Sequence, residues 1–348
     1  RWYTNNGLKK DISVFVKGEY TFLSHWTAYF DLQYRGISLD MTGVDDEFSD
    51  LNYSTKGSFF NPRFGLTFTP AVGHKAYLSA AVGHREPGRS DIKEVIESNN
   101  AGGERAELSP EKMLDFELGY EYTSSRFAAG VNFYAMEYWD MLLETGRLSS
   151  VGYALKENVG RAWRRGIELS GRWTIIPSWS VYANMTLSTN KIKSFTAYVS
   201  KYDNMIDWNP TGQLEEHYDN TTMLMSPSVI SSIGTSVRPF AFYAPLSDLE
   251  FRFDGKFVGK QYWDNTQSDD RSLPAYFVAD ASLSKAFKIK CDSTFSLGLY
   301  VNNLFNNMYC ADAWVARYYF EAEKTYSQDE GLFPQAPMSC MLRAVYNF

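Results

Sequence analysis

The feature that most constrains the fold is a regular alternation of apolar and polar side chains over segments of about ten residues. In the clearest segment, residues 249–257, one face carries Leu249, Phe251, Phe253 and Phe257, and the other carries Glu250, Arg252, Asp254 and Lys256. Because successive side chains of a β-strand point to opposite faces, this pattern predicts a strand with one apolar and one polar face. Strands of this length exceed the usual five or so residues of soluble proteins and match a strand that crosses a membrane.

The same alternation predicts thirteen strands along the chain. They cover about residues 11–22, 26–41, 59–69, 75–84, 114–122, 127–136, 153–173, 179–188, 227–238, 249–257, 274–287, 294–305 and 338–348. Short turns, which hold Ser24, Pro70, Ser124 and Pro177, alternate with long connections, which include residues 85–110, 193–226 and 306–337. Outer-membrane barrels have short periplasmic turns and longer extracellular loops, so every short turn is expected at the periplasmic end.

A large soluble antiparallel sheet, such as a sandwich or a propeller, is the alternative fold. The polar faces argue against it, because side chains such as Arg252 and Asp254 suit a hydrated lumen and not a dry interior. The sequence also lacks the blade-length repeat of a propeller. Finally, the chain stops on an apolar strand at Phe348, and such an edge needs a partner strand, which closure of a barrel supplies. The fold class predicted is therefore an all-β, antiparallel transmembrane β-barrel.

Composition excludes several other classes. The formal net charge of -7 argues against nucleic acid as a partner. Although 44% of the residues are hydrophobic, no uncharged apolar stretch reaches the ~18 residues of a transmembrane helix. The three cysteines are too few, and odd in number, for a disulfide framework. Cys310 and Cys340 are expected near the outer ends of neighbouring elements, either as a disulfide or as free thiols, whereas Cys291 is expected at the opposite end.

An odd strand count predicts further chain upstream. Bacterial single-chain barrels have even numbers of strands, and the sequence begins at Arg1 without a signal peptide. We therefore expect residues 1–348 to be one barrel domain, the C-terminal portion of a barrel of about 22 strands.

Several stretches resemble the C-terminal half of TonB-dependent outer-membrane receptors, particularly those of Bacteroidetes. They are residues 157–169 (ENVGRAWRRGIEL), 273–283 (LPAYFVADASL), 301–309 (VNNLFNNMY) and 333–337 (FPQAP), followed by the terminal Phe348. The resemblance extends over roughly residues 56–348. Asn302 and Asn303 are expected to cap a turn, and Gly160 and Gly166 to mark bulges or bends.

The resemblance implies a receptor in the outer membrane that imports a scarce nutrient, a ferric siderophore, haem or cobalamin, and uses no cofactor. It implies outer-membrane lipids as surroundings and coupling to TonB–ExbB–ExbD through an N-terminal plug that these residues do not contain. It further implies recognition of Tyr346 and Phe348 by the barrel-assembly machinery, and it allows a surface lipoprotein as a partner. The alternatives are a passive porin, a structural or adhesive barrel, and a receptor that imports glycans or peptides.

Binding residues are expected in the long loops and the upper lumen, because loops on a rigid scaffold carry recognition. Candidate ligand-stacking side chains are Tyr198, Tyr202, Trp208, His217, Tyr218, Tyr262 and Trp263. For Trp263, and for Trp139, a place in the outer aromatic belt is the alternative. Arg161, Arg164 and Arg165 are expected to line the lumen as solvated charges.

No enzyme or metal chemistry is predicted. His25, His74, His84 and His217 lie far apart in the sequence, and neither an HExxH motif nor a Ser-centred nucleophile elbow occurs. The acidic stretch Asp45, Asp46, Glu47 and Asp50 is expected to be a solvated loop, with a calcium site as the alternative.

Overall fold

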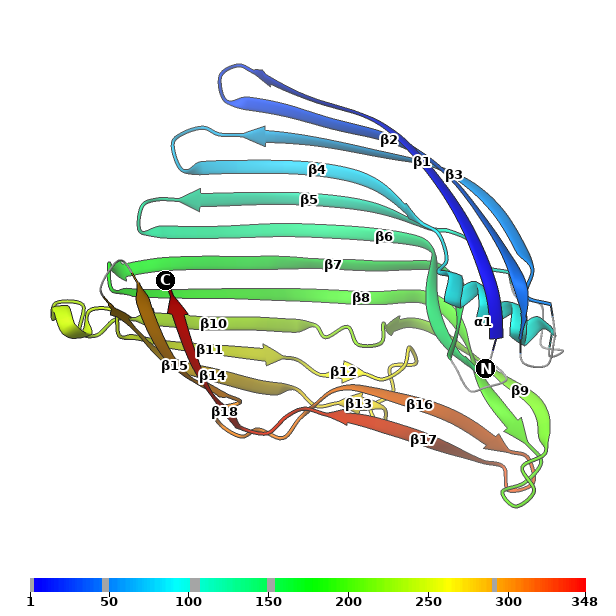
Figure 1. Ribbon diagram of the computed structural model, residues 1–348. Helices are drawn as coiled ribbons and strands as arrows, with labels where there is room; N and C mark the ends of the chain where they lie inside the picture. The colour runs from blue at the N-terminus through cyan, green and yellow to red at the C-terminus, as the bar shows by residue number, and fades with distance from the viewer. Residues whose placement is uncertain (1–2, 46–49, 101–106, 149–153, 290–292) are drawn as a thin grey trace.

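The computed structural model describes residues 3–45, 50–100, 107–148, 154–289 and 293–348. Thirteen antiparallel strands follow one another across a single curved sheet (Figure 1). They are β1 (Tyr3–Phe22), β2 (Trp26–Asp45), β3 (Tyr53–Phe68), β4 (His74–Arg85), β5 (Glu111–Thr123), β6 (Phe127–Leu148), β7 (Ala154–Ile176), β8 (Trp179–Tyr202), β10 (Val229–Val237), β11 (Glu250–Val258), β14 (Tyr276–Lys288), β15 (Thr294–Asn302) and β18 (Ser339–Asn347). They correspond one to one, in order, to the thirteen predicted strands, and the all-β antiparallel prediction is confirmed.

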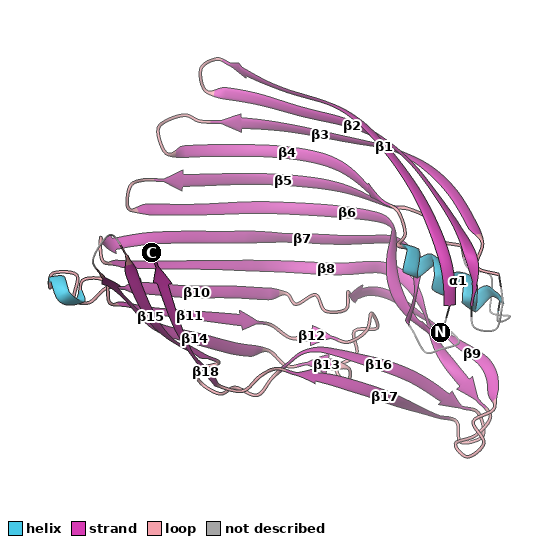
Figure 2. Ribbon diagram, in the orientation of Figure 1, coloured by secondary structure: helices cyan, strands magenta, loops and turns pink. Residues whose placement is uncertain are grey.

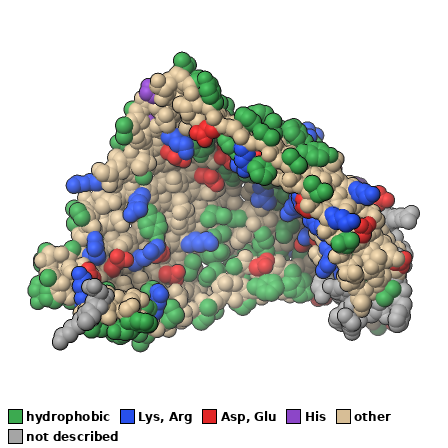
Figure 3. Space-filling model, turned by 45° about the horizontal axis from the view of Figure 1, so that its top comes forward, with side chains coloured by type: hydrophobic (Ala, Val, Ile, Leu, Met, Phe, Trp, Pro, Cys, Tyr) green, Lys and Arg blue, Asp and Glu red, His purple; other side chains and the backbone are tan. Residues whose placement is uncertain are grey.

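The two faces of the sheet differ in chemistry as predicted. Register aligns an apolar row across four strands, in which Leu118 pairs with Phe133, Phe133 with Ile167, and Ile167 with Leu187. Leu118 and Phe133 are 54% and 46% exposed, although both are large apolar residues. The opposite, concave face is hollowed and carries charged side chains of both signs (Figure 3). This is the arrangement of a barrel wall, with lipid against the convex face and water in the lumen.

The two ends of the sheet also differ. The short connections, residues 23–25, 69–73, 124–126 and 177–178, lie at one end, with the end of β18 nearby (left in Figure 1). A longer connection at this end, between β10 and β11, contains the 3-10 helix η1 (Ala244–Leu246). The long connections predicted at residues 85–110, 193–226 and 306–337 lie at the opposite end, so the short turns gather at one end as predicted, and the β10–β11 connection is an exception to the alternation in length. We call the two ends the short-turn end and the long-loop end.

The segments expected to be long loops contain regular structure. Residues 85–110 include the helix α1 (Arg89–Asn100), residues 193–226 continue β8 and return as β9 (Pro210–Thr222), and residues 306–337 form the hairpin of β16 (Cys310–Phe320) and β17 (Thr325–Pro334). Two short strands, β12 (Gln261–Tyr262) and β13 (Ser272–Leu273), lie between β11 and β14. Figure 2 shows that β9, β16, β17 and α1 gather at the long-loop end.

The expected bulge at Gly166 is wrong. The β6–β7 register is continuous there, and Tyr134 pairs with Gly166 across the two strands. A Cβ atom at Gly166 would lie 2.6 Å from the Tyr134 hydroxyl, so glycine leaves room for the tyrosine ring on the concave face. The same pairing of glycine with an overlying tyrosine joins Gly119 to Tyr77. At Gly160 the ladder is interrupted, because the register passes from the Trp139–Arg161 pair to the Met141–Val159 pair and Asp140 between them has a φ of 55°.

The described part of the chain contains no helix with the length and apolar character needed to cross a bilayer.

Candidate functional site

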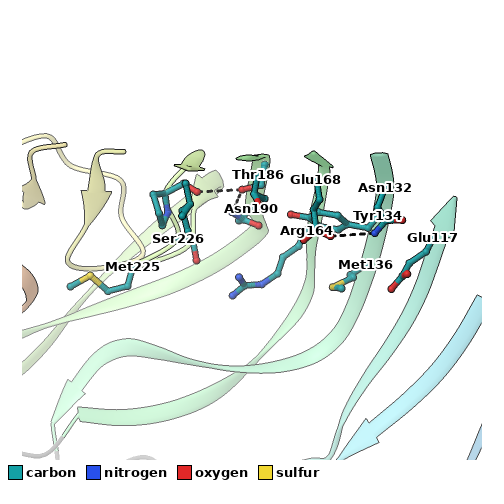
Figure 4. Close-up of a pocket in the computed structure, with 13 residues that line it drawn as sticks. Glu117, Asn132, Tyr134, Met136, Arg164, Glu168, Thr186, Asn190, Met225 and Ser226 are labelled. Carbon is teal, nitrogen blue, oxygen red and sulfur yellow. Dashed lines mark hydrogen bonds between the residues drawn. The ribbon is translucent and has the colours of Figure 1, made fainter. Parts of the chain in front are cut away.

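The concave face of β5–β8 forms a cavity of about 390 Å³ with charged walls (Figure 4). Arg164 from β7 lines this cavity, and its side chain extends away from Glu117, toward the side of Ser226 and Met225. The Asn132 amide donates a hydrogen bond to Glu168 Oε2 at 3.3 Å. Among the described residues, none of Arg164, Glu117 and Glu168 forms an ion pair with a neighbour. The cavity therefore presents charges of both signs to whatever occupies the lumen.

The three arginines predicted to line the lumen lie on two different faces. Arg164 lies on the concave face, but its neighbour Arg165 and residue Arg161 share the convex face with Ile167 and Leu169. Both convex arginines pair with Glu137, which lies on the same face of β6. The lumen assignment was wrong for Arg161 and Arg165, because a one-residue step along a strand reverses the direction of the side chain.

A second cavity, of about 590 Å³, lies at the long-loop end beneath α1. Glu86 accepts hydrogen bonds from Lys9 at 2.6 Å and from Arg35 at 2.8 and 2.9 Å. Burial opposes ionisation of Glu86, but these two cations lower its pKa to about 2. Ile92 of α1 packs on Leu39 and Met41 of β2, and this cluster fixes the helix to the wall.

Two of the predicted aromatic residues meet at the tip of the β8–β9 hairpin. The ring of Trp208 lies 5.1 Å from that of Tyr202 and contacts Tyr318 and Phe320 of β16 edge to face. Tyr318–Phe320 also pairs in parallel with residues 200–202 of β8, which joins the two hairpins. Because these rings pack on one another, the cluster holds the hairpins together and leaves one side of Trp208 open, at 42% exposure.

The other predicted residues of this hairpin have separate partners. Tyr218 stacks on Phe195 and donates to Glu216 at 2.8 Å. His217 Nδ1 lies 2.9 Å from the Thr196 hydroxyl, and the Arg147 guanidinium stacks on Tyr198. The hairpin thus distributes these side chains over different contacts, and their role in ligand binding stays a prediction.

Glu216 is a central group that the sequence analysis missed. It accepts hydrogen bonds from Arg317 at 2.8 Å and from the Tyr326 hydroxyl at 2.9 Å, so it links β9 to both strands of the β16–β17 hairpin. Burial works against the charged form, yet the bonds from Arg317 and the tyrosines hold the pKa of Glu216 below its ordinary value. Its acidic neighbours along the chain gave no indication of this role.

Near β12 and β13, the neighbouring residues Tyr262 and Trp263 have different surroundings. Trp263 is 9% exposed and packs with Leu273 and Ala313, so both the lipid-belt and the open ligand-stacking interpretations are wrong for it. Tyr262 lies beside Lys260, whose ammonium is 5.1 Å from the ring centre. Trp139, in contrast, lies on the convex face of β6, where a belt residue is expected.

Three remaining predictions can be placed. Asn303 caps a turn as expected, because it has a φ of 49° and its side-chain amide donates to the carbonyl oxygens of Asn307 and Ala336. Cys310 and Cys340 are free thiols, so a disulfide between them is not formed. Of the acidic stretch, Asp46 and Glu47 lie outside the described residues. Within the described ranges, no group of three or more His, Cys, Asp or Glu side chains is arranged to hold a metal ion.

The apolar convex face, the charged concave face and the ordered ends define the wall of an outer-membrane β-barrel. The family model described as TonB dependent receptor-like, β-barrel matches residues 1–304. The chain therefore belongs to the β-barrel family of TonB-dependent receptors, which lies in the outer membrane.

Solved structures of receptors share the fold. The siderophore receptor PiuA of Acinetobacter baumannii is 16% identical, with 98% of this chain and 43% of PiuA covered and a TM-score of 0.69. The copper transporter OprC is 13% identical, with 98% of this chain and 48% of OprC covered and a TM-score of 0.69. The ferric yersiniabactin receptor FyuA of Yersinia pestis is 14% identical, with 100% of this chain and 47% of FyuA covered and a TM-score of 0.64. The chain spans less than half the length of these receptors.

Proposed function

We propose that this chain forms part of the wall of a TonB-dependent importer for a scarce nutrient, a ferric siderophore, haem or cobalamin. The observation that carries the proposal is the concave face, where Arg164, Glu117 and Glu168 present charge to the lumen without ion-pair partners among the described residues. A passive wall facing only water gains nothing specific from such charges, whereas an occupied lumen can use them to hold a plug or a polar ligand.

In this proposal the 348 residues are one portion of a longer receptor, in keeping with their match to less than half of PiuA, OprC and FyuA. A plug in the lumen would contact TonB–ExbB–ExbD, and further strands would complete a barrel of about 22. Tyr346 and Phe348 would serve as the recognition element for the barrel-assembly machinery, and the hairpins at the long-loop end offer a place for a surface lipoprotein. The similar receptors, which include a siderophore receptor and a copper transporter, support nutrient import and leave the substrate open.

The test is energy-dependent uptake by cells that express the intact protein. Uptake of labelled ferric siderophores, haem and cobalamin is measured in cells with and without the gene, before and after the proton-motive force is dissipated. An importer loses uptake with the proton-motive force, whereas a porin continues to pass solutes of suitable size. If none of the three substrates is taken up, the proposed substrate class changes to glycans or peptides.

The charged wall is tested by Arg164→Gln in the intact protein. We expect uptake to fall severalfold while the amount of folded protein in the outer membrane is unchanged. The matched control is Lys285→Gln, which removes a cation from the convex face near the short-turn end, where its ammonium donates to the Pro245 carbonyl oxygen. Equal uptake by both variants would show that Arg164 has no part in transport.

A further inference from the structure

The lipid-facing wall carries a group of cations that the import site does not use. Lys112 of β5 pairs in register with Trp139 of β6, and Trp139 pairs with Arg161 of β7. One level lower, Glu137 pairs with Trp163. Lys112, Trp139, Arg161, Trp163 and Arg165 share the convex face with the apolar row, and we call these five residues the outer-face cluster.

Cations and aromatic rings alternate within the outer-face cluster. The Lys112 ammonium lies 5.5 Å from the Trp139 ring centre, and the Arg161 guanidinium approaches the same ring at 5.6 Å. The Arg165 guanidinium lies 4.6 Å from the Trp163 ring centre. Each tryptophan therefore serves as an apolar platform that orients a cation.

The cluster holds more positive than negative charge. Its contacting carboxylate is Glu137, which bonds to Arg165 and lies 3.8 Å from Arg161. Lys112 forms no ion pair with another described residue. Both arginine side chains remain 52% exposed despite their contact with Glu137. Arg161 and Arg165 thus share one carboxylate, Lys112 has none among the described residues, and donors stay free for an anion from outside the protein.

The cluster lies at the level of lipid headgroups. On β7, Arg161 pairs with Trp139 toward the long-loop end. Trp173 lies twelve residues further along the same strand and pairs with Phe127 near the short-turn end. A rise of about 3.4 Å per residue separates these aromatic levels by about 40 Å along the strand, which a tilt of about 40° reduces to about 30 Å across the bilayer. That height matches the hydrocarbon core, so the cluster is at the interface of the outer leaflet.

We propose that the outer-face cluster binds the phosphate groups of an anionic lipid in the outer leaflet. The guanidinium groups of Arg161 and Arg165 offer paired N–H donors that suit phosphate oxygens, and Lys112 adds a point charge. Trp139 and Trp163 lie where the acyl chains meet the headgroups, and the apolar row from Leu118 to Leu187 accommodates the chains below. The site depends on the outer-membrane location and not on the imported substrate.

A lipid is favoured over a protein partner because of where the charges point. Side chains at this level of the convex face project into the membrane, and the nearest apolar row is 39% to 54% exposed at Leu187, Phe133 and Leu118. Such a surface is covered by acyl chains in the outer membrane. A phosphate-bearing lipid satisfies the apolar row and the cations together.

The test measures lipid retention by the intact protein in a neutral detergent. Native mass spectrometry is used to count bound molecules after addition of a diphosphorylated glucosamine lipid or its dephosphorylated form. We expect the wild type and Lys285→Gln to retain the phosphorylated lipid, and the triple variant Lys112→Gln/Arg161→Gln/Arg165→Gln to bind it about tenfold more weakly. Equal binding by the triple variant, or equal binding of the dephosphorylated form, would overturn the proposal.

A second variant tests the proposal in case the triple variant does not fold. Folding of each variant is monitored by its heat-modifiable electrophoretic mobility. Glu137→Gln removes the carboxylate that competes with phosphate and leaves the cations in place, so binding of the phosphorylated lipid should strengthen severalfold. Unchanged or weaker binding by a folded Glu137→Gln protein would contradict a phosphate site. Displacement of the lipid by millimolar inorganic phosphate would show a free-anion site and would also overturn the assignment to lipid. Because uptake is not the readout, failure here leaves the import proposal intact.

Discussion

The wall and the long-loop end of the molecule achieve order in different ways. The fully buried side chains Phe320, Met41, Leu51, Ile192, Met223, Val199 and Asn265 all belong to the long-loop end. The wall between the two ends exposes large apolar residues such as Phe116, Leu118 and Phe133 on its convex face. The wall therefore depends on backbone ladders and on lipid as its apolar partner, whereas the long-loop end packs small cores of its own.

This difference predicts that the two regions are sensitive to different kinds of substitution. Truncation of a large side chain should matter most where protein atoms surround it, because the lost contacts leave a cavity. Introduction of a charge should matter most where lipid surrounds the side chain. The following predictions use substitutions that separate the two cases.

The largest effect is expected for Phe320→Ala at the long-loop end. Phe320 is fully buried against Tyr202 and Trp208, so its removal should cost about 3–5 kcal/mol of local stability. Hydrogen exchange should accelerate at Tyr318–Phe320 and at residues 200–202, which pair in parallel, and should stay unchanged in β1–β7. The control is Phe242→Ala, at a side chain that is 87% exposed. Faster exchange across the whole wall would contradict the separation of the two regions.

A charge on the wall should have the next largest effect. Leu118 lies midway along the apolar band, and Leu118→Arg should destabilise the protein by about 2–4 kcal/mol. Asn132→Arg, one row away on the concave face and beside Glu168, should cost about 1 kcal/mol or less, because water and a carboxylate surround it. Urea unfolding in lipid vesicles compares the two variants. Equal destabilisation would show that the concave face is not hydrated.

The same contrast explains what the sequence could predict. The wall strands are predictable from period-two alternation alone, as at residues 114–122. All thirteen predicted strands occur in the structure in the same order. The β9 segment PTGQLEEHYDNTT has too few apolar residues to alternate, and its order comes from distant partners such as Arg317. Pairing across about a hundred residues of sequence leaves no local pattern, as the 101-residue separation of Glu216 and Arg317 illustrates.

The candidate site shows the same limit. The opposite faces of Arg164 and Arg165 were predictable, because consecutive residues of a strand point in opposite directions. The burial of Trp263 was not predictable, because it depends on Ala313, which follows in a separate hairpin. The turn at Asn303 was predictable, because asparagine tolerates positive φ and bonds to nearby backbone groups.

A smaller effect is expected where charge rather than packing joins the hairpins. Glu216→Gln should cost about 1–3 kcal/mol locally, because Arg317 is 15% exposed and would lose its carboxylate. Glu215→Gln is the matched control, since Glu215 is the exposed neighbour in β9. Limited proteolysis of the β16–β17 hairpin in the intact protein measures the change, and equal cleavage of both variants would contradict it.

Acidification tests the same carboxylate. The pKa of Glu216 is lower in the folded protein than in the unfolded chain, so its contribution is fully present above the unfolded value. As the pH falls from about 7 through the folded pKa, the wild-type hairpin should become easier to cleave, and Glu216→Gln should lose this component of the pH dependence. An identical pH profile in both proteins would show that another group controls the hairpin.

The smallest effect, and one of opposite sign, is expected at the short-turn end. Leu23 occupies the β1–β2 turn with a φ of 50°, a left-handed conformation that costs a side chain with a Cβ atom about 1 kcal/mol. Leu23→Gly should relieve this strain and, after the entropy of glycine in the unfolded chain is subtracted, stabilise the hairpin by about 0.5 kcal/mol. Val72→Gly, at a fully exposed residue of the next short turn, is the control and should not stabilise. Because the wall depends on its ladders, the gain should appear as slower exchange at the Phe22–Trp26 pair. Destabilisation by Leu23→Gly would show that the leucine side chain itself anchors the turn in the membrane interface.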